Sequence, residues 1–156
     1  MSVRNCAELG ENLHKIISRL LANDNLINLL YYTDDNPLKM DSHPPLSEYD
    51  KQKQVCEKLI RTVPRIGTKE TENSMIVVYV QRASKLSGNK EFRNVRFVVD
   101  VVVPLTQWFI MDTNFRPFAI LGEIQKSLDD KTVNGLGKIS GGDFELNFVT
   151  DDVICY

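Results

Sequence analysis

The residues that could do chemistry are few and scattered. The chain has two histidines, His14 and His43, and three cysteines, Cys6, Cys56 and Cys155. No HxxxH, HExxH or CxxC arrangement joins them, so the sequence predicts no metal centre. A cysteine nucleophile needs a base beside it in space; Cys56 and His43 are close enough in sequence to be considered, but nothing else completes the set. We therefore expect no catalytic residue, no cofactor and no enzymatic activity.

The glycine-rich segment 134–142 superficially resembles a phosphate-binding loop, but it has neither GxxxxGK[ST] nor GxGxxG spacing. Its glycines follow a predicted helix and precede a predicted strand, which is the wrong order for an anion site at a helix N-terminus. A helix stop followed by a turn is the better interpretation. Three acidic pairs, at 34–35, 129–130 and 151–152, lie at element edges and are typical of solvated turns.

Composition indicates one soluble globular domain. The 156 residues are 42% hydrophobic and 26% charged, and 19 basic residues face 21 acidic ones. The net charge of -2 argues against a dedicated nucleic-acid binder, although a local basic patch is compatible with it. The scattered cysteines fit a reducing compartment. Without an apolar N-terminal region or a run near the ~20 residues that span a bilayer, we expect cytoplasmic synthesis and no membrane association.

The element that must position everything else is the segment 91–128. A run of valines from Val95 to Val103 predicts a central strand, which Pro104 closes. A short run at 108–111 predicts another strand, and a turn then leads into a helix. The apolar stripe of that helix comprises Ile120, Leu121, Ile124 and Leu128. Arg116, at the start of this helix, is expected to form a structural ion pair with Asp112 or Asp100.

Two helices are predicted before this core. The first spans 7–21, with an apolar stripe on one face and polar residues, among them Asn12, on the other. The second follows a cap at Asn23 or Asp24 and is apolar almost all round. Its apolar residues are either core or a contact with a partner chain. The candidate subunit interface on this helix consists of Leu26, Leu30, Tyr31 and Tyr32.

A second strand is predicted at 75–81, and a basic loop at 82–90 then connects it to the valine strand. The nine-residue loop is longer than a hairpin needs, and it carries Arg82, Lys85 and Lys90. Long loops on a rigid sheet commonly carry interactions. The last strands are expected at 144–148 and, as an edge, at 153–156.

The predicted architecture is a single α+β domain over 1–156, with a helical part at 7–61 and a sheet-plus-helix part at 75–156. Its sheet has three to five strands, antiparallel or mixed. N-terminal helices and one inserted helix flank that sheet.

The order of these features resembles a known family. An amphipathic helix runs into LINLLYYTDDNPL, and FRNVRFVVDVVVP follows later. A tryptophan comes next. Arg116-Pro117-Phe118 then begins a helix that ends near VNGLGKI. Over residues 9–148 this pattern is similar to the neck and tail-completion proteins of long-tailed bacteriophages, in particular the tail terminators.

The resemblance implies an α+β subunit of a homohexameric ring in the virion neck. Such a ring caps the tail tube protein, stops its polymerisation and docks the tail to the head connector. DNA passes through its lumen without sequence readout. Arg82, Lys85 and Lys90 are then candidates for contacting the tube or lining the lumen. Trp108 is either an interface anchor or a core residue. The alternatives are a head-side connector adaptor and a small nucleic-acid-binding domain that uses residues 82–93.

Overall fold

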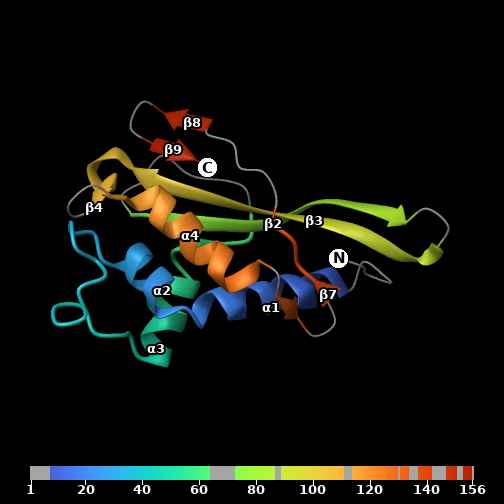
Figure 1. Ribbon diagram of the computed structural model, residues 1–156, viewed down its shortest axis with the longest axis horizontal. Helices are drawn as coiled ribbons and strands as arrows, with labels where there is room; N and C mark the ends of the chain where they lie inside the picture. The colour runs from blue at the N-terminus through green and yellow to red at the C-terminus, as the bar shows by residue number, and fades with distance from the viewer. Residues whose placement is uncertain are drawn as a thin grey trace.

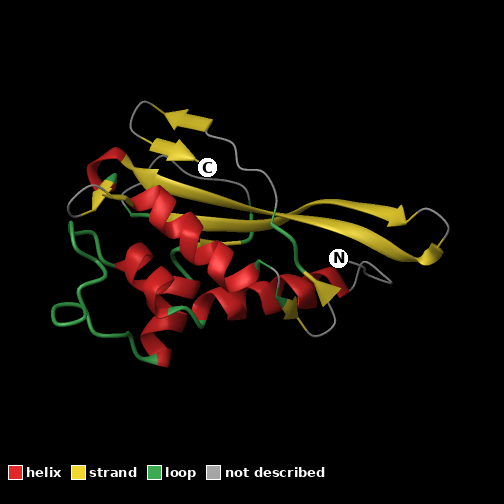
Figure 2. Ribbon diagram, viewed as in Figure 1, coloured by secondary structure: helices red, strands yellow, loops and turns green. Residues whose placement is uncertain are grey.

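The computed structural model describes residues 8–63, 73–86, 89–110, 114–129, 131–133, 137–141, 147–150 and 153–155. It confirms the predicted α+β class, with helices packed along one mixed sheet (Figures 1 and 2). The helices are α1 (Glu8–Leu21), α2 (Asp24–Tyr31), α3 (Glu48–Asp50) and α4 (Arg116–Leu128). A π-helical turn, Lys51–Cys56, extends α3, and a 3-10 turn covers Leu105–Gln107.

Among the described residues, the main sheet has five strands in the order β1-β2-β3-β9-β8. They are β1 (Ile60–Arg61), β2 (Met75–Leu86), β3 (Asn89–Pro104), β8 (Asn147–Thr150) and β9 (Val153–Cys155). β1 runs parallel to β2, and the other neighbours are antiparallel, which makes the sheet mixed. The expectation that the last strand is an edge is wrong, because β9 lies between β3 and β8.

Two short ladders stand apart from the main sheet. β4 (Phe109–Ile110) pairs with β5 (Asn114–Phe115), and β6 (Thr132–Val133) pairs with β7 (Gly137–Lys138). The predicted strand at 108–111 therefore pairs locally rather than within the main sheet. Of the predicted strand at 144–148, the part before Asn147 lies outside the described residues.

The core lies between the sheet and helices α1, α2 and α4. Val101, Val102 and Val103 on β3 are 0% exposed, as their β-branched run predicts. They pack in one cluster with Leu20 of α1 and Ile120 of α4. The first helix matches its predicted stripe except at Asn12, which is buried instead of facing solvent. The sheet and its helical layer therefore share one core.

Helix α2 is part of this core, and this corrects one prediction. Leu26 and Leu30 are both 0% exposed inside the single chain, so they are not available as a subunit interface. Asn23 caps α2 by accepting a hydrogen bond from the Leu26 amide at 3.2 Å, as the sequence predicts. Its side-chain amide also donates to Oγ of Ser127 at 2.9 Å and to Oε2 of Glu123 at 3.1 Å. One asparagine thus starts α2 and ties it to α4.

Candidate functional site

The first candidate surface is a long two-stranded ribbon formed by the ends of β2 and β3. The predicted nine-residue loop is wrong: β2 continues to Leu86 and β3 begins at Asn89. Arg82 and Lys85 therefore lie on β2, and Lys90 lies on β3. Polar residues suit a ribbon whose two faces both meet solvent, so polar composition did not mark a loop here. The ribbon extends past the helical layer along the long axis of the molecule (Figure 1).

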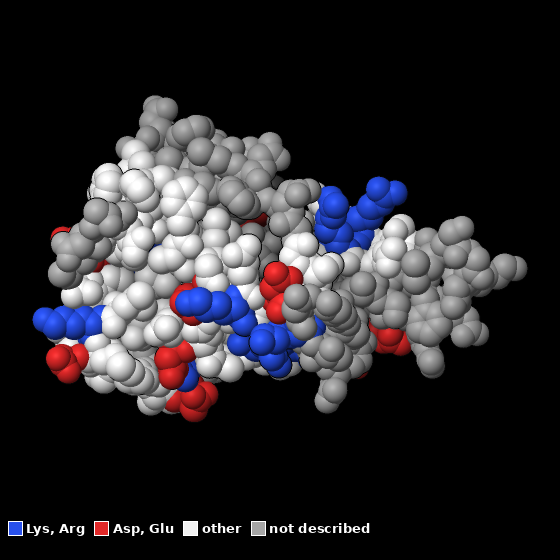
Figure 3. Space-filling view, in the orientation of Figure 1, with Lys and Arg blue, Asp and Glu red and all other residues white. Residues whose placement is uncertain are grey.

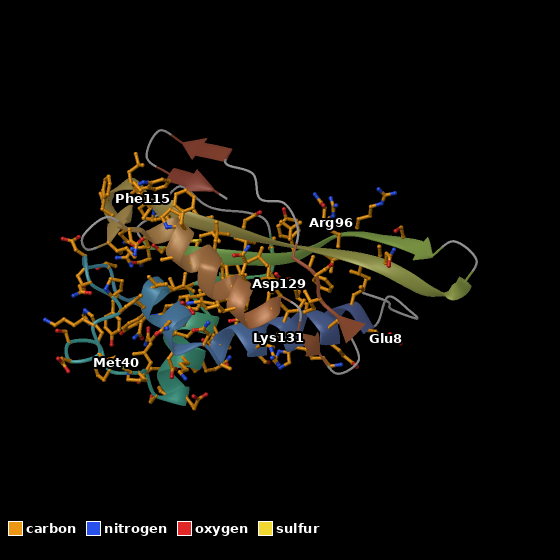
Figure 4. The ribbon with its side chains drawn as sticks, in the orientation of Figure 1. Glu8, Met40, Arg96, Phe115, Asp129 and Lys131 are labelled. Atoms are coloured by element: carbon orange, nitrogen blue, oxygen red, sulfur yellow. The ribbon has the colours of Figure 1, made fainter. Side chains whose placement is uncertain are left out.

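The strand register of this ribbon sets basic residues opposite one another. Arg82 lies opposite Arg96, and Lys85 lies opposite Arg93. Between them come the uncharged pairs Ala83–Val95 and Ser84–Asn94. Arg82 and Arg96 are exposed, and Figure 3 shows basic side chains gathered where the ribbon leaves the body, at the position of Arg96 in Figure 4. Within the described part of the chain, neither arginine forms an ion pair with an acidic side chain.

The second candidate surface is an aromatic cluster at the opposite end of the long axis (Figure 4). Phe109, Phe115 and Phe118 are 66%, 37% and 49% exposed. The Phe115 ring lies at the centre, with its centroid 5.4 Å from that of Phe109 and 5.9 Å from that of Phe118. Trp108 completes the cluster at 6.4 Å from Phe115 and packs partly against the core. Exposed apolar groups in contact with one another mark an interaction surface more strongly than scattered ones.

Local backbone structure brings these aromatic residues together. The β4–β5 ladder sets Phe109 directly opposite Phe115. The Arg116 amide then donates to the Trp108 carbonyl at 2.8 Å, and α4 begins with Pro117 in its first turn. Of this group, only Trp108 is predicted from the sequence as a candidate contact residue. The sequence does show three phenylalanines close to the tryptophan. That their rings are in contact follows only from the pairing of β4 with β5 in the structure.

Arg116 anchors the base of the aromatic cluster through main-chain carbonyls, and it does not form the predicted ion pair with Asp100. The side chain is 0% exposed. Nε donates to the Gln107 carbonyl at 2.9 Å, and one terminal nitrogen donates to the carbonyls of Leu29 at 2.8 Å and Tyr32 at 2.6 Å. Asp112 lies outside the described residues. The guanidinium therefore ties the C-terminal end of α2 to the start of α4 through main-chain oxygens.

The carboxylates of Asp34 and Asp35 offset the buried positive charge of Arg116 without direct contact being needed. Its other terminal nitrogen donates to the main-chain carbonyl of Asp34 at 2.5 Å. Burial lowers the pKa of Arg116, while the carboxylates of Asp34 and Asp35 oppose that shift. A cation next to the carbonyls that end a helix is also favoured by the helix dipole. The arginine thus satisfies oxygens that α2 and the following turn would leave without donors.

The loop that follows α2 packs against its last residues. His43 Nε2 lies 2.8 Å from an Asp34 carboxylate oxygen, and its ring centroid lies 4.0 Å from that of Tyr32. Burial raises the pKa of Tyr32, and the neighbouring Tyr31 and Asp34 add to the shift. Of the four residues predicted as a subunit interface on α2, Tyr31 remains 37% exposed and Tyr32 is half-buried. These two tyrosines stay available for a partner.

The reactive residues named from the sequence are not grouped in the described part of the chain. His14 is exposed on α1, and burial raises the pKa of the Cys56 thiol. Among the described residues, no three His, Cys, Asp or Glu side chains come together as a cation site. In the same ranges, no helix is long and apolar enough to span a bilayer.

A shallow depression of about 910 Å³ lies between α1 and α4, lined in part by Lys15, Arg19 and Lys126. Two of these cationic side chains already have partners within the chain. Arg19 Nε donates to the Ser127 carbonyl at 3.0 Å, and Lys126 Nζ lies 2.5 Å from Glu123 Oε1. We therefore assign the candidate functional surfaces to the ribbon and to the aromatic cluster.

The structure thus defines an α+β protein with two unlike exposed surfaces at opposite ends. The YomW family model matches residues 23–152, and the chain belongs to this family. The family is phage-derived and Bacillus SPbeta-like, so the chain is a phage-associated protein. No curated protein and no solved structure matches it.

Proposed function

We propose that this chain is a structural assembly protein of the phage particle, a tail terminator located in the virion neck. Homohexameric rings of it cap the tail tube, stop tube polymerisation and dock the tail to the head connector. The observation that carries the proposal is the presence of two unlike exposed surfaces at opposite ends of the subunit. The phage-derived family supports a phage-associated protein, and the α+β fold agrees with the subunit that the resemblance implies.

A closed ring needs a heterologous contact, in which one surface of a subunit meets a different surface of its neighbour. The aromatic cluster and Tyr31 supply apolar surface suited to such a contact. With about 200 Å² for a whole phenylalanine side chain, the three exposed rings present about 300 Å². A stable interface covers about 800 Å² per partner, so the cluster would form its centre and need a polar rim. Trp108, behind Phe115, would stiffen that centre.

The ribbon then meets either the tail tube or the DNA in the lumen. Arg82, Lys85 and Lys90 are the predicted contacts to the tail tube or the lumen, and all three belong to the strands of the ribbon, which extends past the helical layer (Figure 1). DNA would pass through the lumen without sequence readout.

Deleting the gene and viewing the particles by electron microscopy tests the proposal. A missing terminator leaves tails of uncontrolled length, because nothing stops the addition of tube subunits. Tails of normal length without heads would instead assign the chain to the head-side adaptors. Particles with normal, attached tails would overturn both assignments.

The mass in solution gives a second test. We expect a hexamer, or a monomer that closes into a ring only on purified tail tubes. A stable dimer that neither forms rings nor binds tubes would contradict the proposal.

A further inference from the structure

The ribbon concentrates positive charge in a chain that is otherwise acidic. Residues 82–96 hold five of the 19 basic residues and one of the 21 acidic ones, a net charge of +4. The remaining 14 basic and 20 acidic residues give the rest of the chain a net charge of -6. The overall value of -2 therefore conceals a separation of charge between ribbon and body. A polyanion would be repelled by the body and attracted by the ribbon.

The register of the ribbon sets like charges opposite one another. Like charges directly opposite on neighbouring strands destabilise a sheet, by about 0.2–1 kcal/mol for each pair. The register has two such pairs, Arg82–Arg96 and Lys85–Arg93. Neither Arg82 nor Arg96 has an acidic partner within the described ranges. An external anion would remove this repulsion.

The two basic pairs stand three register positions apart, and in a regular strand such positions belong to opposite faces. Arg82 and Lys85 are three residues apart on β2, and successive residues of a strand alternate between faces. A docked protein would cover one face and leave the other pair without a partner. A nucleic-acid duplex presents phosphates from two strands and can meet both pairs. The two uncharged pairs, Ala83–Val95 and Ser84–Asn94, lie between the basic pairs. Their side chains are shorter than arginine or lysine, so the ribbon is narrower there.

The dimensions favour B-form DNA over RNA. Two strands lie about 4.8 Å apart, and the major groove of B-DNA, about 12 Å wide, admits a two-stranded ribbon. The major groove of an A-form RNA helix is too narrow for one. From Arg82 to Leu86 the ribbon reaches about 13 Å at the usual rise of a strand.

We infer that the β2–β3 ribbon is a DNA-binding arm, which contacts the phosphates of B-form DNA through Arg82, Lys85, Arg93 and Arg96. Binding is independent of base sequence, because phosphate contacts carry no sequence information. The surface is complete in one subunit, so the inference goes beyond the proposed ring and does not depend on its assembly.

The test is fluorescence anisotropy with a labelled 30-base-pair duplex and the full chain, at several salt concentrations. Each phosphate contact contributes a slope of about -0.9 in log affinity against log salt, or a factor of about 5 at 0.15 M salt. The double variant Arg82→Ala/Arg96→Ala should therefore bind about 30-fold more weakly at that salt and lower the slope by about 2. Circular dichroism checks that the fold is retained.

Charge-reversal variants separate binding from stability. Arg82→Glu sets a carboxylate opposite Arg96, so it should weaken DNA binding while leaving stability equal or higher. Lys39→Glu makes the same charge change at an exposed position in the loop after α2 and is the matched control. Its affinity should stay within about threefold of wild type, because its distance from the ribbon leaves only the long-range charge effect.

Three results would overturn the inference. They are no salt-dependent binding by the wild type, equal losses in Arg82→Glu and Lys39→Glu, and displacement of the duplex by poly-glutamate at equal charge concentration. The last would point to an acidic protein as the partner. These results are independent of the tail-length experiment, so either proposal can fail while the other stands.

Discussion

Replacing Arg116 by methionine tests the anchor beneath the aromatic cluster. Methionine keeps the apolar stem but removes every donor. Two of the four carbonyls that Arg116 serves, those of Gln107 and Leu29, then lie buried without that donor. An unsatisfied buried polar group costs about 1–3 kcal/mol. Removing the buried charge recovers part of this, because burying an ion is itself costly. We expect a loss of about 2–4 kcal/mol in the free energy of unfolding.

That loss is a large share of the roughly 5–15 kcal/mol that holds a domain together, and it should lower the Tm by about 4–16 °C. Urea unfolding can be followed by the fluorescence of Trp108, the only tryptophan, which accepts a backbone hydrogen bond from Arg116. Arg19→Met is the matched control, since Arg19 gives one part-buried hydrogen bond to the Ser127 carbonyl. Arg116→Lys should fall between them, because an ammonium cannot reproduce the planar fork. If Arg116→Met loses no more than Arg19→Met, the anchor is refuted.

Two further predictions concern the aromatic surface and the sheet. The double variant Phe109→Ser/Phe118→Ser should keep its urea midpoint within about 0.5 M of wild type, because both side chains are largely exposed, yet lose ring formation, alone or on purified tail tubes, in light scattering. An unchanged mass distribution would contradict the role of the cluster. Burial raises the pKa of Asp100, against the opposing hydrogen bond from Tyr79, so ionisation costs stability as the pH rises through the raised pKa. Asp100→Asn should therefore be more stable than wild type near pH 7, and urea unfolding should show the gain disappearing as the pH falls to about 4.

The sequence predicts those elements whose cause is local. The stripe of α1, the cap at Asn23 and the valine run of β3 each follow from residues close together in the chain, and all three are present. The segment 82–90, with Ser87-Gly88-Asn89 between two strands, predicts a hairpin loop, but β2 continues to Leu86 and β3 begins at Asn89, because polar residues are compatible with a strand. Burial of Leu26 and Leu30 depends on α4 and the sheet, which lie far away in sequence.

The candidate surfaces were predicted only in part, for a physical reason. The basic residues of the ribbon can be read from the sequence. The pairing of Arg82 with Arg96 cannot, because it depends on the register between β2 and β3, which no local sequence pattern determines. Arg116 shows the same limit. Its sequence neighbours suggested a carboxylate partner, whereas the fold presents it with carbonyls from a helix more than eighty residues earlier. Every residue has a main-chain carbonyl, so a sequence does not indicate which carbonyls will accept a hydrogen bond from a given side chain.

The two surfaces place different demands on one subunit, and the fold keeps them apart. An aromatic contact gains from apolar burial and persists at high salt, whereas phosphate contacts weaken as salt rises. Raising the salt should therefore release DNA from the ribbon while leaving contacts through Phe109, Phe115 and Phe118 in place. If both proposals hold, a ring assembled at low salt keeps its mass at 0.5 M salt and loses its bound duplex. Loss of the ring together with the duplex would show instead that the ribbon, or the DNA on it, holds the subunits together.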